Sequence, residues 1–133
     1  MKKHLFPLLA LLLLFAVGSL HGQTGALKAT IPFAFTAGDI TLPAGEYRVT
    51  ALNDTGTLLV AGTKSGFVST HPVETTPASA STRLVFHQYG NHYFLYQIWV
   101  QGENLGRELP KTPMEKEVAR NGWPTAVAVL ASK

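Results

Sequence analysis

The chain has 133 residues, which suits a single globular domain, and it contains no cysteine. A disulfide scaffold and a thiolate metal site are therefore excluded. The formal net charge is +3, and it falls to +1 once Lys2 and Lys3 are set aside. A chain so close to neutrality has no basic cluster that neutralises several phosphates, so we expect no nucleic-acid partner.

The N-terminus has the layout of a secretory signal peptide. Two lysines precede an apolar run over residues 5–17, and small or polar residues follow over 18–22. An uncleaved anchor is the weaker alternative, because the run is shorter than the roughly 20 residues that a membrane-spanning helix needs. We expect a signal peptide over 1–22 and one domain over 23–133. Export to the periplasm or the cell exterior follows, with no stable transmembrane insertion after cleavage.

The residues after Ala26 alternate between apolar and polar side chains, with Gly, Asn, Asp and Pro between the runs, which predicts antiparallel strands. Pro32 cannot donate to a strand ladder and so indicates an edge or a bulge. Residues 72–82 have almost no bulky apolar side chain and are expected to form a surface loop. The first expected strands cover 30–35, 46–51, Thr57–Ala61 and 67–71.

Two aromatic and β-branched runs, 83–89 and 92–100, predict a hairpin with Gly90-Asn91 as its turn. Both faces carry large apolar groups, so we expect protein to cover much of each side. The expected register pairs Tyr89 with His92, His87 with Phe94, and Val85 with Tyr96. The expected opposite face carries Leu84, Phe86, Leu95 and Trp99.

One short helix is expected after the hairpin. Thr112 supplies a capping hydroxyl, Pro113 stands at the first helical position, and Glu115 lies three residues after the cap. The helix should end near 121–122, and 125–130 should form a last strand that closes the domain. The predicted fold is therefore all-β, a single antiparallel β-sandwich or small β-barrel with one short helix in the C-terminal region.

The histidines and rings of the hairpin are the candidate ligand-binding residues. His87 and His92 share a predicted face, but zinc or copper needs a third ligand there, and the neighbouring Tyr89, Phe94 and Tyr96 are poor ligands for divalent metals. We therefore expect no metal site and no cofactor. The same five side chains offer a stacking platform for a sugar or an apolar molecule, with core packing as the alternative.

No pattern of catalytic residues stands out. The acidic side chains form no converging pair, and Glu108, Glu115 and Glu117 are expected on a solvated face near or on the helix. Lys64-Ser65-Gly66 is similar to the K-S-G element of penicillin-binding enzymes, but the S-x-x-K partner is missing, so a turn is expected. We predict no catalytic residue.

Several segments along the chain form a recognisable pattern, namely Ile31-Pro32-Phe33-Ala34-Phe35, 42–47, Leu84-Val85-Phe86, Tyr89-Gly90, Tyr93-Phe94-Leu95 and 106–110. Together they resemble a family of short bacterial proteins that carry signal peptides and have no assigned activity. The resemblance covers nearly the whole chain after the expected signal, and it implies no catalytic residue and no ligand.

The leading functional hypothesis is a noncatalytic exported domain that acts as an interaction or envelope-associated module. Its partner would be a protein or an envelope component, and the oligomeric state stays open. The first alternative is a binder of a small apolar or sugar ligand in an aromatic pocket. The second is a hydrolase, which the sequence supports least because it lacks a recognisable nucleophile and base.

Overall fold

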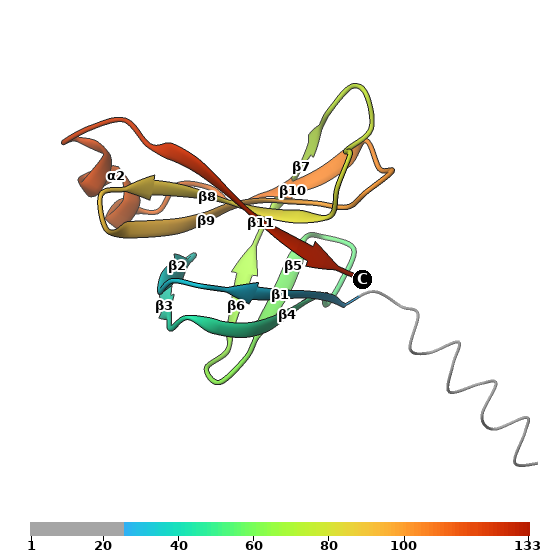
Figure 1. Cartoon of the computed structure of the whole chain (residues 1–133), viewed down its shortest axis with the longest axis horizontal. Coiled ribbons are helices and arrows are strands. Elements are labelled where there is room, and N and C mark those ends of the chain that lie inside the picture. Colours follow the sequence, from blue (N-terminus) through green and yellow to red (C-terminus); the bar gives the residue numbers. More distant parts are fainter. Residues whose placement is uncertain (1–25) are drawn as a thin grey trace, which may run out of the picture.

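The computed structural model describes residues 26–133, and the expected signal peptide over 1–22 lies outside the described residues. The described part consists mostly of strands, with one short helix (Figure 1). The strands are β1 (Leu27–Ile31), β2 (Phe35–Ala37), β3 (Ile40–Leu42), β4 (Gly45–Ala51), β5 (Thr57–Ala61), β6 (Gly66–Ser69), β7 (His71–Glu74), β8 (Arg83–Tyr89), β9 (His92–Trp99), β10 (Leu105–Glu108) and β11 (Thr125–Ser132), and the helix is α2 (Pro113–Ala119).

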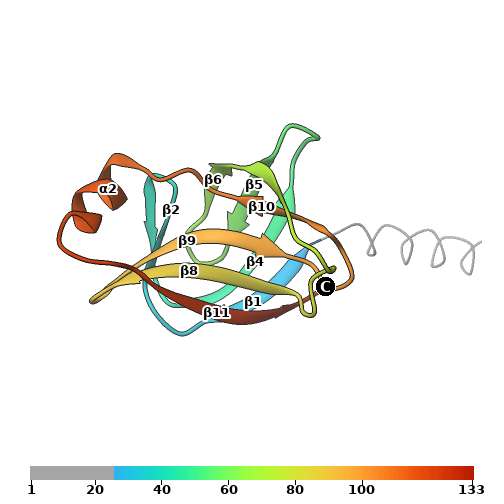
Figure 2. The same ribbon diagram turned by 90° about the horizontal axis from the view of Figure 1, so that it is seen from above.

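The strands form one sheet that nearly closes into a barrel, which confirms the all-β prediction. Their order is β3-β2-β9-β8-β11-β1-β4-β5-β6, and β10 lies between β9 and β7. β11 pairs with β8 over most of its length and with β1 at Ala131 and Ser132. It therefore carries the sheet from one layer to the other, as Figures 1 and 2 show, and closes the domain as expected.

Only Thr70 separates β6, which pairs with β5, from β7, which pairs with β10. We call this residue the joint between the two strands. The backbone N–H and the hydroxyl of Thr70 both donate to the carbonyl oxygen of Gly56, at 3.0 Å and 2.6 Å. Gly56 has φ +102°, and a Cβ there would lie 2.4 Å from the Thr70 carbonyl oxygen. Glycine is therefore required at this joint for both its φ angle and its close backbone approach.

The core lies between the two layers and follows the alternation that the sequence predicted. In β4 the side chains of Tyr47 and Val49 are buried while Glu46 and Arg48 are exposed. The ring of Phe35 packs edge-on against Tyr47 and Phe86, with ring centroids 5.2 Å and 5.4 Å apart. The cluster consists of Leu27, Ala29, Ile31, Phe35, Ala37, Leu42, Tyr47, Val49, Leu58, Val60, Val68, Leu84, Phe86, Leu95, Ile98 and Leu109.

Several expected boundaries were wrong, and the strand expected over 67–71 is divided at Thr70 between β6 and β7. The strand expected over 30–35 is divided, because β1 ends at Ile31 and Pro32 lies outside the ladder. The loop expected over 72–82 begins only after Glu74, since β7 pairs with β10. Backbone pairing of a short strand does not need the bulky apolar side chains on which the prediction relied.

The register of the hairpin agrees with the prediction near the turn and differs beyond it. Tyr89 pairs with His92 and His87 with Phe94, as expected. A bulge next to Phe86 then shifts the register, so Val85 pairs with Gln97 and not with Tyr96. One extra residue reverses the alternation of the following side chains. Ile98 therefore joins the core, and Trp99 lies on the opposite face, contrary to the prediction.

The helix α2 begins where the sequence predicted. The Thr112 hydroxyl accepts a hydrogen bond from the backbone N–H of Glu115 at 3.3 Å, and Pro113 occupies the first turn. The helix ends at Ala119, and a turn follows over residues 120–121. A helix of seven residues is not stable alone, so its position depends on contacts with the sheet.

Candidate functional site

The candidate site is the face of the β8–β9 hairpin that points away from the core. His87 and Tyr89 reach this face from β8, and Phe94 and Tyr96 reach it from β9. The bulge keeps Tyr96 on this face, where its ring stacks on the imidazole of His87 with centroids 3.8 Å apart. Tyr89 and Phe94 are buried and pack edge to face, with centroids 5.9 Å apart.

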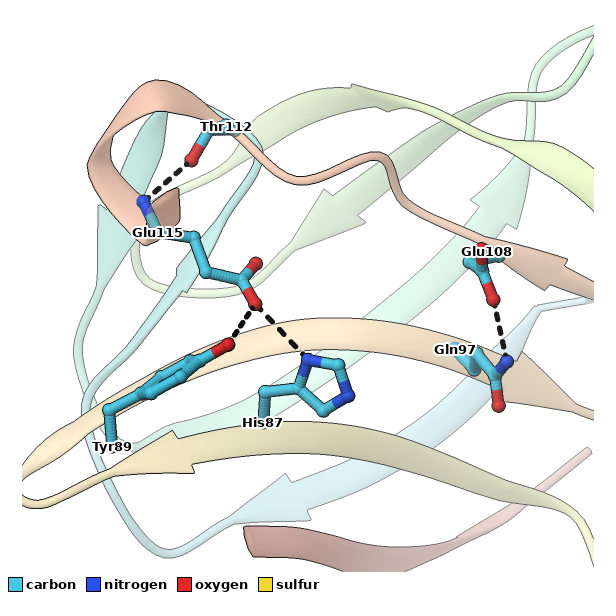
Figure 3. A network of polar contacts seen from close by, with 6 residues as sticks. All are labelled: His87, Tyr89, Gln97, Glu108, Thr112 and Glu115. Carbon is cyan, nitrogen blue, oxygen red and sulfur yellow. Dashed lines mark hydrogen bonds and ion pairs between the residues drawn. The ribbon is translucent and has the colours of Figure 1, made fainter. Parts of the chain in front are cut away.

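The carboxylate of Glu115 on α2 lies over His87 and Tyr89 (Figure 3). The Tyr89 hydroxyl donates to Oε2 of Glu115 at 2.9 Å, and Nδ1 of His87 lies 3.1 Å from the same oxygen. Glu115 is only 5% exposed. Burial, the hydrogen bond to Glu115 and the charge of Glu115 raise the pKa of Tyr89 to about 12. The network therefore holds α2 on the sheet and keeps Tyr89 in its neutral, donating form.

The burial of Glu115 is a correction to the sequence analysis, which placed this carboxylate on a solvated face. Glu117, on the same helix, is exposed as expected. The sheet explains the difference, because α2 lies against the hairpin with the Glu115 carboxylate toward His87 and Tyr89 (Figure 3). The signal in the sequence was the pair of polar rings, His87 and Tyr89, on a hairpin face otherwise suited to burial.

Glu108 anchors a second group of contacts along the same face. One carboxylate oxygen accepts from Nε2 of Gln97 at 2.7 Å (Figure 3), and the other lies 3.1 Å from Nε2 of His71. Burial raises the pKa of Glu108, but contacts with Gln97, Tyr96 and His71 outweigh it and leave the pKa below its usual value. Burial and the nearby carboxylates of Glu108 and Glu115 raise the pKa of Tyr96.

The contacts continue from Gln97 to the far end of the hairpin. The indole N–H of Trp99 donates to Oε1 of Gln97 at 3.0 Å, and the guanidinium of Arg83 lies 5.8 Å from the centroid of the Trp99 ring. Arg83 also donates to the hydroxyl of the buried Ser79 at 2.7 Å. Polar side chains on this face therefore bond mainly to one another, which is the usual state of polar groups in a protein interior.

The contact between Glu115 and His87 resembles part of a catalytic triad. Nδ1 of His87 lies 3.1 Å from Oε2 of Glu115, the arrangement by which a carboxylate orients the histidine of a catalytic triad. A nucleophile would have to lie beside Nε2. Within residues 26–133, no side chain forms a hydrogen bond with Nε2 of His87, so the pair has no triad partner.

Of the five candidate ligand-binding residues, the structure brings four together: His87, Tyr89, Phe94 and Tyr96. His92 lies opposite Tyr89 in the register but is exposed at the end of the hairpin. In the described part of the chain, no three His, Asp or Glu side chains are grouped so that they could hold a metal ion. A surface hollow lies elsewhere, and the residues that line it include Lys28, Thr30, Glu46, Arg48 and Leu130.

Trp123, which was not among the predicted site residues, lies between α2 and β11 and is 95% exposed. The sequence did indicate a surface position for this residue. In Asn121-Gly122-Trp123-Pro124 the indole is flanked by turn-forming residues, which are typical of the protein surface.

Comparisons with known proteins found no relative for the chain. No protein-family model, no curated protein and no solved structure matches it. Among the helices of the described residues, none is long and apolar enough to cross a membrane.

Proposed function

We propose that the chain is an exported, noncatalytic β-domain that acts by contact with an envelope component, and that it is one of the short signal-bearing bacterial proteins it resembles. The observation that carries the proposal is the exposure of Trp123 beside a rigidly held helix. A large aromatic side chain left in water is typical of a contact surface, because aromatic anchors are enriched where proteins bind partners or membrane interfaces.

The state of the hairpin face supports a noncatalytic role. Tyr89 and Phe94 are buried, His87 is covered by Tyr96, and the carboxylate of Glu115 is occupied by two hydrogen bonds. These groups fix α2 in place and leave the residues after the helix on the surface. The site therefore has a structural task, which is to support the exposed segment around Trp123.

Export and contact are tested by expressing the full chain with a C-terminal tag in a bacterial host and separating cytoplasm, periplasm, envelope and medium. We expect the chain outside the cytoplasm, shortened near residue 22, and recovered with the envelope. Retention of the whole chain in the cytoplasm would contradict export. Recovery from the exported fractions without any envelope or protein component would contradict the contact role.

The noncatalytic role is tested with ester, glycoside and peptide substrates. We expect no turnover above that of a His87→Gln variant, which keeps a polar side chain at this position but removes the imidazole. Turnover that the variant loses would show that the pair of His87 and Glu115 is catalytic, and the proposal would be wrong on that point.

A further inference from the structure

One end of the molecule carries exposed apolar side chains. Trp123 is 95% exposed and Met114, on α2, is 51% exposed. Figures 1 and 2 show α2 at the same end as the turn between β8 and β9. We call the exposed side chains of Lys111, Lys116, Arg120 and Trp123 the α2 surface.

The α2 surface is positively charged. Lys111, Lys116 and Arg120 are exposed, whereas the only exposed acidic side chain among residues 109–133 is Glu117, whose Oε2 lies 3.5 Å from Nη1 of Arg120. The neighbouring hairpin adds no compensating charge, because residues 84–100 contain no Asp, Glu, Lys or Arg. Apolar and basic side chains therefore occur together without a matching group of acidic ones.

The chain keeps these groups close to one another. Arg120 and Trp123 are three residues apart, so their Cα atoms are separated by at most about 11 Å. Met114 lies six residues before Arg120, and the helical rise places it about 9 Å further along the axis. Lys116 and Arg120 are four residues apart and lie on the same side of α2, so they can meet a flat partner together, whereas Met114 lies on the other side of the buried Glu115.

We propose that the α2 surface binds membranes that contain anionic lipid headgroups, with the indole of Trp123 in the headgroup layer and Lys116 and Arg120 beside the phosphates. Tryptophan favours this layer because its ring is apolar and its N–H is polar. Basic side chains add attraction to an anionic surface, and they match its charge without a shaped pocket. The inference rests on the proposed function and names the envelope component as lipid.

The test measures the tryptophan emission of the full chain with two kinds of vesicle, one of phosphatidylcholine alone and one that also contains phosphatidylglycerol. The spectrum of Trp123→Ala is subtracted, because Trp99 is buried and gives a background signal. Emission of Trp123 is the chosen readout because the apolar run over 5–17 can itself associate with lipid. Brominated lipids then report whether the indole reaches the bilayer.

We expect a blue shift and bromine quenching of Trp123 with the anionic vesicles only. Lys116→Glu changes the local charge by two and should raise the lipid concentration for the half-maximal shift roughly 25-fold, at about fivefold per charge. Lys64→Glu is the matched control, because Lys64 is exposed in the loop between β5 and β6, and it should change this concentration much less. High salt should reduce the shift.

Unchanged emission with anionic vesicles, an equal shift with phosphatidylcholine alone, or equal effects of Lys116→Glu and Lys64→Glu would overturn the inference. If the chain is nevertheless recovered with the envelope, the proposed function stands and only the lipid assignment is wrong. Capture of a protein through Trp123 with no response to vesicles would likewise replace lipid by a protein partner.

Discussion

Replacing Glu115 by alanine tests the network that holds α2 on the sheet. The substitution removes the acceptor of the Tyr89 hydroxyl and the partner of Nδ1 of His87, 2.9 Å and 3.1 Å away. Both groups lie in largely buried positions, so little water is available to replace the carboxylate. The substitution therefore leaves two polar groups unsatisfied at once.

The expected loss is large for one side chain. A buried polar group that loses its partner costs about 1–3 kcal/mol, so two groups predict a loss of about 2–6 kcal/mol in the free energy of unfolding. For a domain of about 100 residues, this corresponds to a fall of roughly 10 °C or more in Tm. Glu117→Ala is the matched control on the same helix, and its exposed carboxylate predicts a change within about 0.5 kcal/mol.

Urea unfolding and hydrogen exchange measure the effect. We expect the amides of residues 116–120 to lose protection in Glu115→Ala, because seven residues cannot sustain a helix without its contacts to the sheet. Adding Tyr89→Phe removes one of the two polar groups that Glu115→Ala leaves without a partner. The loss in the free energy of unfolding of the double variant should therefore be about 1 kcal/mol smaller than the sum of the two single losses.

The reasoning would be refuted if Glu115→Ala lowered stability no more than Glu117→Ala and left the exchange of α2 unchanged. Additive losses in the double variant would show that Tyr89 and Glu115 are not coupled. The first result would mean that packing alone positions the helix, and the second would leave His87 as the partner that holds Glu115.

Titrations and a turn substitution test other contacts of the fold. The lowered pKa of Glu108 means that its contribution to stability is present above the ordinary pKa of 4.5 and is lost as pH falls through the folded value. In Glu108→Gln the midpoint of urea unfolding should fall less as the pH is lowered, and a pH profile equal to that of the original chain would contradict this. Tyr89, with a pKa of about 12, should lose its stabilising contribution as pH rises from 10 to about 12. Tyr89→Phe should remove the latest-ionising phenol from an absorbance titration, and retention of that phenol would assign it elsewhere. Gly56→Ala should cost about 2 kcal/mol or more in thermal unfolding, because its Cβ would meet the Thr70 carbonyl oxygen, and a smaller loss would mean that the joint relaxes.

Local pattern in the sequence was sufficient for many of the elements. The strand Thr57–Ala61 was expected with the boundaries that β5 has, and the cap at Thr112 was expected where α2 begins. Tyr89 and His92 pair across the turn as predicted. Each of these features depends on residues within a few positions of one another, so period-two alternation, turn residues and capping residues are enough to specify them.

The candidate site was predicted only in part. The sequence placed His87, Tyr89, Phe94 and Tyr96 on one hairpin face, and the structure brings these four together. The polar rings of His87 and Tyr89 indicated that a partner was needed, but not that Glu115, more than 20 positions later on the helix, would supply it. A helix of two turns has several possible orientations, and only the sheet beneath it selects the one that buries Glu115.

The sequence by itself determined that the chain alternates into strands, where the hairpin turns and where the helix begins, because these choices are made by neighbouring residues. Only the tertiary structure decided the bulge beside Phe86, the pairing of β7 with β10 and the burial of Glu115. The physical reason is closure. A sheet that returns to its own edge must adjust register and bury particular faces, and those adjustments depend on strands that lie far apart in the chain.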